Sequence, residues 1–165
     1  MHSLCIAHVS DTHVMGTGEP YRGVDVDART RSVFERILAE GRADLIAHTG
    51  DVIARDADPV TGYGFYRKLL HGVQLPVLHV PGNHDRVDLW SDGVSPRAET
   101  AFPGEPAWVA EIGGCRFSGC DSSSGVGRVP PLTARSETRP ARRTASAAAG
   151  AGADPPVVVL VHHHL

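Results

Sequence analysis

The chain has 165 residues, of which 41% are hydrophobic and 21% are charged, and this length and composition fit one soluble globular domain, residues 1–165. Its formal net charge of −3 provides no overall attraction to nucleic acid or to an anionic membrane surface. No apolar run approaches the ~20 residues that cross a bilayer, and the first residues lack the charged region of a signal peptide. Three cysteines without a CxxC pair indicate reduced thiols, so we expect a cytoplasmic protein.

The first apolar run, Leu4–Val9, is predicted to be a buried strand that leads into Ser10-Asp11-Thr12-His13. Residues two apart on an extended chain project to the same side, so Asp11 and His13 can face one point. A carboxylate and an imidazole that converge at a strand end suit a divalent metal ion. Taken alone, the tripeptide is explained equally well by a helix-capping Asp followed by a loop histidine.

A polar loop at Val14–Asp27 is predicted next, and then a helix over Ala28–Glu40 that Gly41 ends. The apolar positions of this helix are Val33, Phe34, Ile37 and Leu38. A second buried strand at Asp44–Ala47 is followed by His48-Thr49-Gly50-Asp51, which again places an Asp just beyond a strand. His48 is more readily explained as a buried strand-end histidine than as a ligand.

The chain then continues with a predicted loop at Arg55–Gly64 and a short helix that begins at Phe65. A third strand at Leu75–Val80 leads into Pro81-Gly82-Asn83-His84-Asp85. Asn83 offers an oxygen ligand, His84 an imidazole, and Asp85 a carboxylate that can orient the imidazole. Three polar clusters thus follow three strands, and the carboxyl edge of a parallel sheet is where ligands bind.

Beyond residue 86 the pattern predicts a hairpin, Trp108–Ile112 and Cys115–Gly119, which begins an antiparallel part of a mixed sheet. Residues 122–156 are rich in Gly, Ala, Ser, Pro and Arg and are predicted to be a flexible low-complexity segment. A last strand, Val157–Val161, precedes three consecutive histidines. Their position after a core strand favours a native site over a tag remnant, and His162 is the chosen ligand because it is nearest the strand end, with His163 as its alternative.

These residues suit two metal ions that clamp an in-line phosphoryl displacement. Asp51 is the natural bridging carboxylate, with Asp11 and His13 completing the protein ligands of one ion. Asn83 and His162 would complete those of the other. His84 would then approach the phosphate as a catalytic residue oriented by Asp85, while a metal-bridging hydroxide attacks.

The segments Asp11-Thr12-His13, Gly50-Asp51 and Gly82-Asn83-His84-Asp85 resemble the calcineurin-like metallophosphoesterases. In order and spacing they are most similar to the bacterial class III cyclic-nucleotide phosphodiesterases. The resemblance implies a four-layered α/β-β/α sandwich, two ions (iron, manganese or zinc), and the same ligand sets, with His84 as the catalytic histidine. It covers Ile6–Arg86 and reappears at Val157–His164.

The family closes its site with a Gly-His-x-His segment that this sequence does not contain. We therefore expect a C-terminally truncated member with weak metal binding and slow turnover of a small phosphodiester, a cyclic nucleotide being favoured. The alternatives are a non-catalytic remnant that binds metal or phosphate, and a nuclease of the same superfamily, which the acidic-to-neutral N-terminal part disfavours. Membrane and nucleic-acid partners are not expected, and a homodimer is left open because a truncated sheet exposes strand edges.

Overall fold

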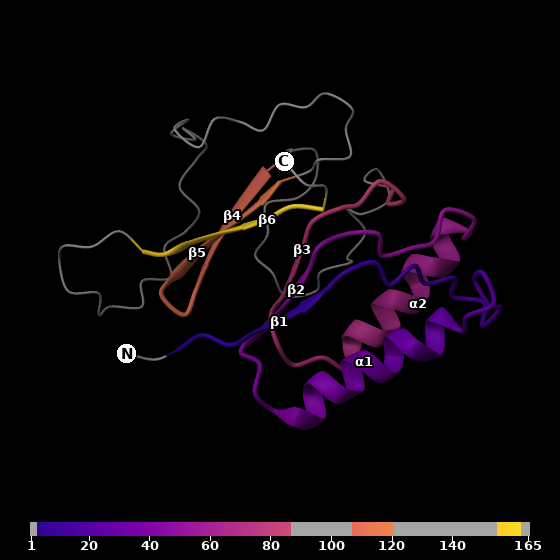
Figure 1. Ribbon diagram of the computed structural model, residues 1–165, viewed down its shortest axis with the longest axis horizontal. Coiled ribbons are helices and arrows are strands. Elements are labelled where there is room, and N and C mark those ends of the chain that lie inside the picture. Colours follow the sequence, from indigo (N-terminus) through magenta and orange to yellow (C-terminus); the bar gives the residue numbers. More distant parts are fainter. Residues whose placement is uncertain (1–2, 87–106, 121–154, 163–165) are drawn as a thin grey trace.

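The computed structural model describes residues 3–86, 107–120 and 155–162 of the chain. It contains two three-stranded sheets, and both helices lie on the same side of the first sheet (Figure 1). One apolar core lies between the helices and the first sheet, and a second core lies between the two sheets. The predicted α/β class with mixed sheets is therefore confirmed, and the described residues supply three of the four expected layers.

The first sheet consists of the parallel strands β1 (Ile6–Val9), β2 (Leu45–His48) and β3 (Val77–His79), in that order. Its register pairs Val9 with His48 and His48 with His79, so the three strands end at one edge. The central strand β2 is buried along its whole length, as expected for a parallel strand covered on both faces. This shared edge carries the three polar clusters that follow the strands.

Helix α1 (Val26–Glu40) begins two residues before the predicted start, because the Asp25 side chain accepts a hydrogen bond from Ala28 N at 2.9 Å and caps it. Gly41 ends the helix in the left-handed conformation, as predicted. Two of the four apolar positions named for this helix do not face the core. Val33 and Leu38 are exposed, since the helix rests on the sheet through the stripe that contains Phe34.

Helix α2 (Pro59–His71) corrects the predicted loop at residues 55–64. The Asp58 side chain accepts a hydrogen bond from Thr61 N at 2.9 Å, and Pro59 occupies the first turn, where its missing N–H has no intrahelical partner to lose. The Asp-Pro pair signalled this start. Two glycines within the segment, Gly62 and Gly64, favoured the loop interpretation, but Gly62 is buried against Ile53 and packs as a helix residue.

The second sheet has the order β4 (Ala107–Ile112), β5 (Cys115–Cys120) and β6 (Val157–Leu160). Strands β4 and β5 form the predicted hairpin, while β6 pairs with β5 in parallel, which makes the sheet mixed. Phe117 and Leu160 face the first sheet and are buried, whereas Val109, Val157 and Val159 are exposed. Within the described residues no helix covers that outer face, where the fourth layer was expected.

The predicted flexible segment at residues 122–156 lies outside the described residues except for its last two positions, and His163 also lies outside them. No helix in the described part of the chain combines the length and the apolar character needed to cross a bilayer.

Candidate metal centre

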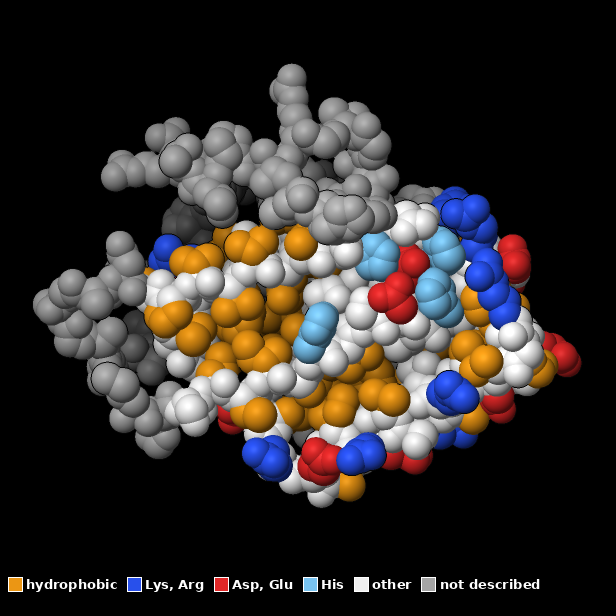
Figure 2. Space-filling view, in the orientation of Figure 1, with side chains coloured by type: hydrophobic (Ala, Val, Ile, Leu, Met, Phe, Trp, Pro, Cys, Tyr) orange, Lys and Arg blue, Asp and Glu red, His pale blue; other side chains and the backbone are white. Residues whose placement is uncertain are grey.

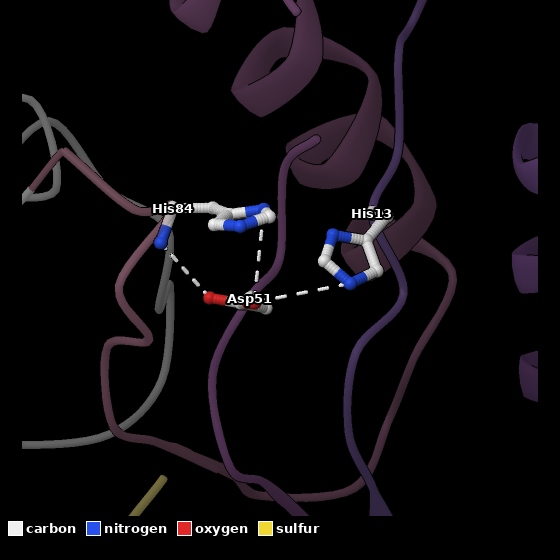
Figure 3. Close-up of side chains that lie close together, drawn as sticks. All are labelled: His13, Asp51 and His84. Atoms are coloured by element: carbon white, nitrogen blue, oxygen red, sulfur yellow. Dashed lines mark hydrogen bonds and ion pairs between the residues drawn. The ribbon is translucent and has the colours of Figure 1, made fainter. Parts of the chain in front are cut away.

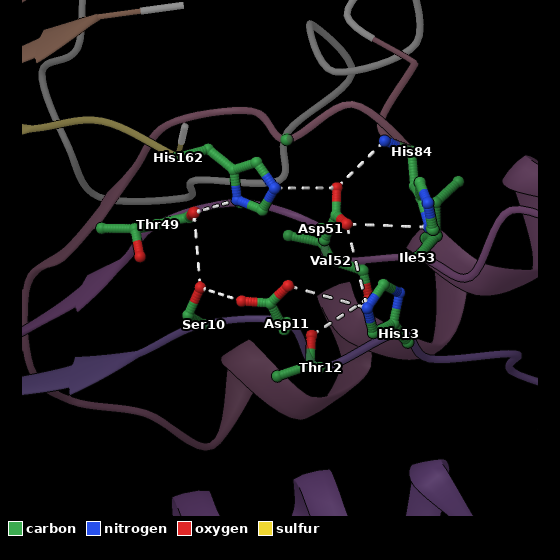
Figure 4. Close-up of polar contacts among 12 residues, drawn as sticks. Ser10, Asp11, Thr12, His13, Thr49, Asp51, Val52, Ile53, His84 and His162 are labelled. Atoms are coloured by element: carbon green, nitrogen blue, oxygen red, sulfur yellow. Dashed lines mark hydrogen bonds and ion pairs between the residues drawn. The ribbon is translucent and has the colours of Figure 1, made fainter. Parts of the chain in front are cut away.

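Four segments that follow strands meet at one edge of the molecule (Figure 4). Asp11 N donates to Gly50 O and His13 N to Asp51 O, both at 3.0 Å, so the turns after β1 and β2 stay paired beyond the strands. His84 N donates to Asp51 Oδ1 at 2.9 Å, which ties the turn after β3 to the same aspartate. His162 follows β6, so both sheets contribute to this edge.

The backbone is strained where the ligand candidates lie. Asp11, His13 and Asp51 have φ values of 55°, 47° and 52°, in the left-handed region that non-glycine residues seldom occupy. Among the described non-glycine residues, Arg22 is the one other residue with a positive φ, and it is not a ligand candidate. Strain of this kind costs on the order of 1–3 kcal/mol per residue and tends to persist at functional sites.

Asp51 is buried at the centre of the cluster, and its two carboxylate oxygens face different histidines. Oδ2 lies 3.8 Å from His13 Nε2 and 3.7 Å from His84 Nδ1 (Figure 3). Oδ1 lies 3.5 Å from His162 Nε2. A carboxylate with one oxygen on each side occupies the position that a bridging ligand requires.

The candidate ligand atoms form two groups that share Asp51, and within each group all atoms lie within 4.8 Å of one another. The groups are His13, Asp51 and His84, and Asp11, Asp51 and His162. This division differs from the predicted one, which placed Asp11 with His13. Asp11 Oδ1 also lies 3.7 Å from His13 Nε2, so Asp11 stands between the two groups. Figure 2 shows acidic and histidine side chains gathered at this point of the surface.

Hydrogen bonding assigns the tautomer of His162. Its Nδ1 lies 2.7 Å from the carbonyl oxygen of Thr49, which can only accept, so Nδ1 carries the proton. In the neutral ring Nε2, which faces Asp51, keeps its lone pair. A metal-ligating histidine commonly donates its other ring N–H in this way.

The role predicted for Asp85 is wrong. Its carboxylate accepts hydrogen bonds from Val52 N, Ile53 N, Gly82 N and Tyr63 Oη. Asp85 therefore holds the turns after β2 and β3 together, and the carboxylate that faces the His84 ring is that of Asp51. Burial raises the pKa of Asp85, while the backbone N–H donors and the Tyr63 hydroxyl act in the opposite direction. Asn83, the remaining predicted ligand, is exposed in the same turn.

Beneath the cluster lie two fully buried histidines. His48, expected to be a buried strand-end residue, is one of them, and its ring stacks on that of His79 with centroids 5.8 Å apart. Burial lowers the pKa of His79 to about 3. Burial, followed by the proximity of His79, lowers the pKa of His48 well below its usual value. Both rings are therefore neutral at physiological pH.

Sequence reasoning did not single out Tyr21, which lies in the loop predicted at residues 14–27. Its ring centroid is 5.8 Å from that of His13, and the Arg22 guanidinium lies 5.3 Å from the Tyr21 ring centroid. Gly23 allows the tight turn that positions these residues, with φ +80°. A Tyr-Arg-Gly sequence in a polar loop is a weak signal, because its position beside His13 depends on how the loop folds back.

The comparison with family models matches residues 5–164 to the calcineurin-like phosphoesterase model. The chain belongs to this family. The match includes all the segments that form the cluster, and family membership confirms the resemblance seen in the motifs. It also supports the metallophosphoesterase fold predicted for the chain.

Two curated relatives agree with the family. The chain is 34% identical over 85 residues to a probable cyclic nucleotide phosphodiesterase of Rhodococcus erythropolis (strain PR4 / NBRC 100887). This match covers 48% of this chain and 28% of the relative. It is also 32% identical over 85 residues to the glycerophosphodiester phosphodiesterase GpdQ of Enterobacter lignolyticus (strain SCF1). This second match covers 50% of this chain and 30% of the relative. The matched part thus spans less than a third of either relative.

The residues of the cluster fit the metal ions that the family implies. Nδ1 of His84 is buried and makes no hydrogen bond to the described residues, although Asp51 Oδ2 is 3.7 Å away. Leaving such an atom unpaired costs roughly 1–3 kcal/mol. Zinc-type ligands bind at about 2.0–2.2 Å, so two ligands of one ion stand roughly 3–4 Å apart. The spacing and the mixed nitrogen and oxygen donors therefore suit a transition metal.

Proposed function

We propose that the chain forms a metal-dependent phosphodiester hydrolase site with two metal ions, and that a cyclic nucleotide is the favoured substrate. The observation that carries this proposal is the buried Asp51 carboxylate, whose oxygens face two separate ligand groups. Both relatives are named as phosphodiesterases, which favours a diester over a monoester. A glycerophosphodiester is the second candidate substrate, from the name of one relative.

In this proposal Asp51 would contribute to both ions, Asp11 and His162 would hold one of them, and His13 would hold the other. Asn83, in the turn after β3, adds the oxygen ligand that the resemblance implies. Iron, manganese and zinc all accept nitrogen and carboxylate ligands. Bound ions would polarise a phosphoryl group and lower the pKa of an attacking water molecule.

His84 is proposed as the catalytic histidine. Its backbone N–H is held by Asp51 Oδ1 at 2.9 Å, and its ring is partly buried beside the ring of His13, with centroids 4.9 Å apart. This arrangement restricts the ring to the rim of the cluster, where it can donate a proton to a leaving oxygen or stabilise developing charge. A ring that groups with His13 and Asp51 can also bind an ion. Removing the ring separates the two roles: a catalytic histidine is needed for turnover but not for metal content, whereas a required ligand is needed for both.

The test uses the 165-residue chain and three matched variants, Asp51→Asn, His84→Ala and Asp56→Asn. Asp56 is an exposed aspartate outside the cluster and serves as the control. Metal content is measured after loading with manganese or zinc, and hydrolysis is measured on cyclic AMP, glycerophosphocholine, a bis-nitrophenyl diester and a nitrophenyl monoester. We expect Asp51→Asn to lose both ions and His84→Ala to lose turnover while it retains metal.

A loaded chain that hydrolyses the monoester faster than every diester would overturn the assignment to diesters. If the wild-type chain binds no metal, and its metal content equals that of Asp51→Asn, the result would support the alternative of a non-catalytic remnant. The three cysteines are unpaired in the structure, which supports the further proposal of a reducing, cytoplasmic location.

A further inference from the structure

His48 is the last residue of β2 and lies between the two turns that carry most of the candidate ligands. Its side chain is fully buried, and the Tyr66 ring meets it edge-on at a centroid distance of 5.6 Å. With His79 stacked nearby, the ring has little freedom to rotate. Its two nitrogens are thus presented to fixed neighbours.

One nitrogen of His48 contacts the turn after β1. Thr12 Oγ1 donates its only proton to Val52 O, a carbonyl oxygen, at 3.0 Å. At its contact with His48 Nε2, 3.2 Å away, the hydroxyl must therefore accept, and Nε2 carries the ring proton. Thr12 lies between Asp11 and His13, so this bond holds the segment that bears both side chains.

The other nitrogen contacts the turn after β2. Gly50 N donates to His48 Nδ1 at 3.3 Å, which requires a lone pair on Nδ1 and agrees with a proton on Nε2. Gly50 immediately precedes Asp51, and its carbonyl oxygen accepts from Asp11 N at 3.0 Å. One neutral imidazole in a single tautomer thus bonds to both turns.

We propose that His48 is a positioning residue of the metal centre, one that holds the Asp11-Thr12-His13 turn and the Gly50-Asp51 turn in the relative placement that converges their ligands. The proposal rests on the metal-dependent function proposed above. It explains why a polar ring occupies a fully buried strand end, where an apolar residue of the same size would avoid the cost of burying two nitrogens. It also explains how Asp11, His13 and Asp51 keep left-handed φ values, because the two turns that contain them are bonded to the same His48 ring.

A residue that only fills space would be replaced without loss by an apolar ring. The test therefore compares His48→Phe, which keeps ring volume and loses both bonds, with two partial replacements. His48→Gln places an N–H donor near Nε2 and can bond to Thr12, while His48→Asn places an acceptor near Nδ1 and can bond to Gly50. These variants separate the two contacts, and they keep the proposal testable if His48→Phe does not fold.

The first measurement uses the metal-free chain, so that it does not depend on metal binding. Nitrogen-15 NMR should show a proton on Nε2 and none on Nδ1 of His48. In His48→Phe the amide signals of Asp11, His13 and Asp51 should shift, while those of the last turn of α1, which leads to the opposite end of β2, stay in place. A proton on Nδ1, or unchanged signals at all three residues, would overturn the proposal.

The second measurement is the affinity for manganese by calorimetry. We expect His48→Phe to bind about 10–100-fold more weakly, a loss of the size seen when groups that orient metal ligands are removed, because the two turns that carry the candidate ligands lose their shared contact. His48→Gln and His48→Asn should each recover part of the loss. Equal manganese affinity in the wild-type chain and in a folded His48→Phe variant would overturn the proposal. If the wild-type chain binds no manganese while the NMR result is as expected, only the metal-dependent function is overturned.

Discussion

The backbone of Gly82 lies directly against Asp51. A Cβ atom at Gly82 would stand 2.1 Å from Asp51 Oδ1 and 2.3 Å from Asp51 N. Gly50, with φ +93°, is equally confined, since its Cβ would lie 2.6 Å from Gly82 N and 2.8 Å from His162 Nδ1. The turns after β2 and β3 can meet because neither glycine has a side chain.

Replacing Gly82 with alanine should therefore displace the Asp51 carboxylate. We expect Gly82→Ala to lower the free energy of unfolding by about 1–3 kcal/mol, the usual cost of overpacking, and to weaken metal binding. The control is Gly64→Ala, because nothing lies within 4 Å of a Cβ there and the residue is inside α2. Alanine should stabilise that helix by roughly 0.5–1 kcal/mol. Urea unfolding measures the stability of each variant, and calorimetry measures its metal affinity. If Gly82→Ala is as stable as the wild-type chain and binds metal equally well, the close packing of Gly82 against Asp51 is wrong.

The buried contact between Tyr63 and Asp85 predicts a loss of stability. Tyr63 Oη donates to Asp85 Oδ1 at 3.1 Å and accepts from Arg86 N at 2.8 Å, so it connects α2 to the turn after β3. Tyr63→Phe removes both hydrogen bonds and should lower the free energy of unfolding by about 1–3 kcal/mol. Asp85→Ala leaves Val52 N and Gly82 N without an acceptor and should cost more. If Asp85→Ala unfolds like wild type in urea, the structural role of this carboxylate is wrong.

The buried histidine His79 predicts a stability that depends on pH. Its pKa is about 3 in the folded chain and has its ordinary value of 6.5 when unfolded, because burial disfavours the charged ring. Between these values the unfolded chain binds the extra proton, so stability is full above pH 6.5 and falls as the pH decreases toward 3. The slope from this one histidine is about 1.4 kcal/mol per pH unit.

Urea unfolding of the metal-free chain between pH 7.5 and pH 4.5 measures this slope. His79→Gln should reduce it by about the contribution of one histidine, because glutamine does not titrate. The matched control His71→Gln makes the same substitution at an exposed position. A slope that stays the same in His79→Gln would show that His79 is not buried in the neutral form.

The buried carboxylate of Asp27 holds the loop that contains Tyr21. It accepts hydrogen bonds from Met15 N at 2.8 Å, Gly16 N at 3.1 Å and Gly18 N at 3.0 Å. Asp27→Ala removes all three acceptors, so the three amides should exchange with deuterium faster than in wild type. Glu35→Gln, an exposed change on the same helix, is the control.

In hydrolysis assays with the diesters named above, the same Asp27→Ala change should raise KM more than it lowers kcat, because the loop lies beside His13 and the cluster itself is not altered. Unchanged amide exchange together with unchanged KM would contradict the role of Asp27 in holding this loop.

Local sequence was sufficient for the strands and for the side chains that follow them. Each of the three predicted strands is followed, within four residues, by Asp11, Asp51 or His84, and parallel strands bring their carboxyl ends to a single edge. The start of α2 at Pro59 could also have been read from its Asp-Pro pair, but two internal glycines reduced the helical signal. The exposure of Val33 could not be predicted, because the face that a helix buries depends on its docking angle.

The sequence by itself therefore determined the family motifs, the strand-end position of the candidate ligands and the central place of Asp51 among them. Only the tertiary structure decided which atoms each residue meets. Asp85 bonds to backbone N–H groups of Val52 and Ile53, which are far from it in the chain, and His48 bonds to two separate turns. Hydrogen bonds require a distance near 3 Å and a defined direction, and residue type and spacing alone specify neither across separate segments.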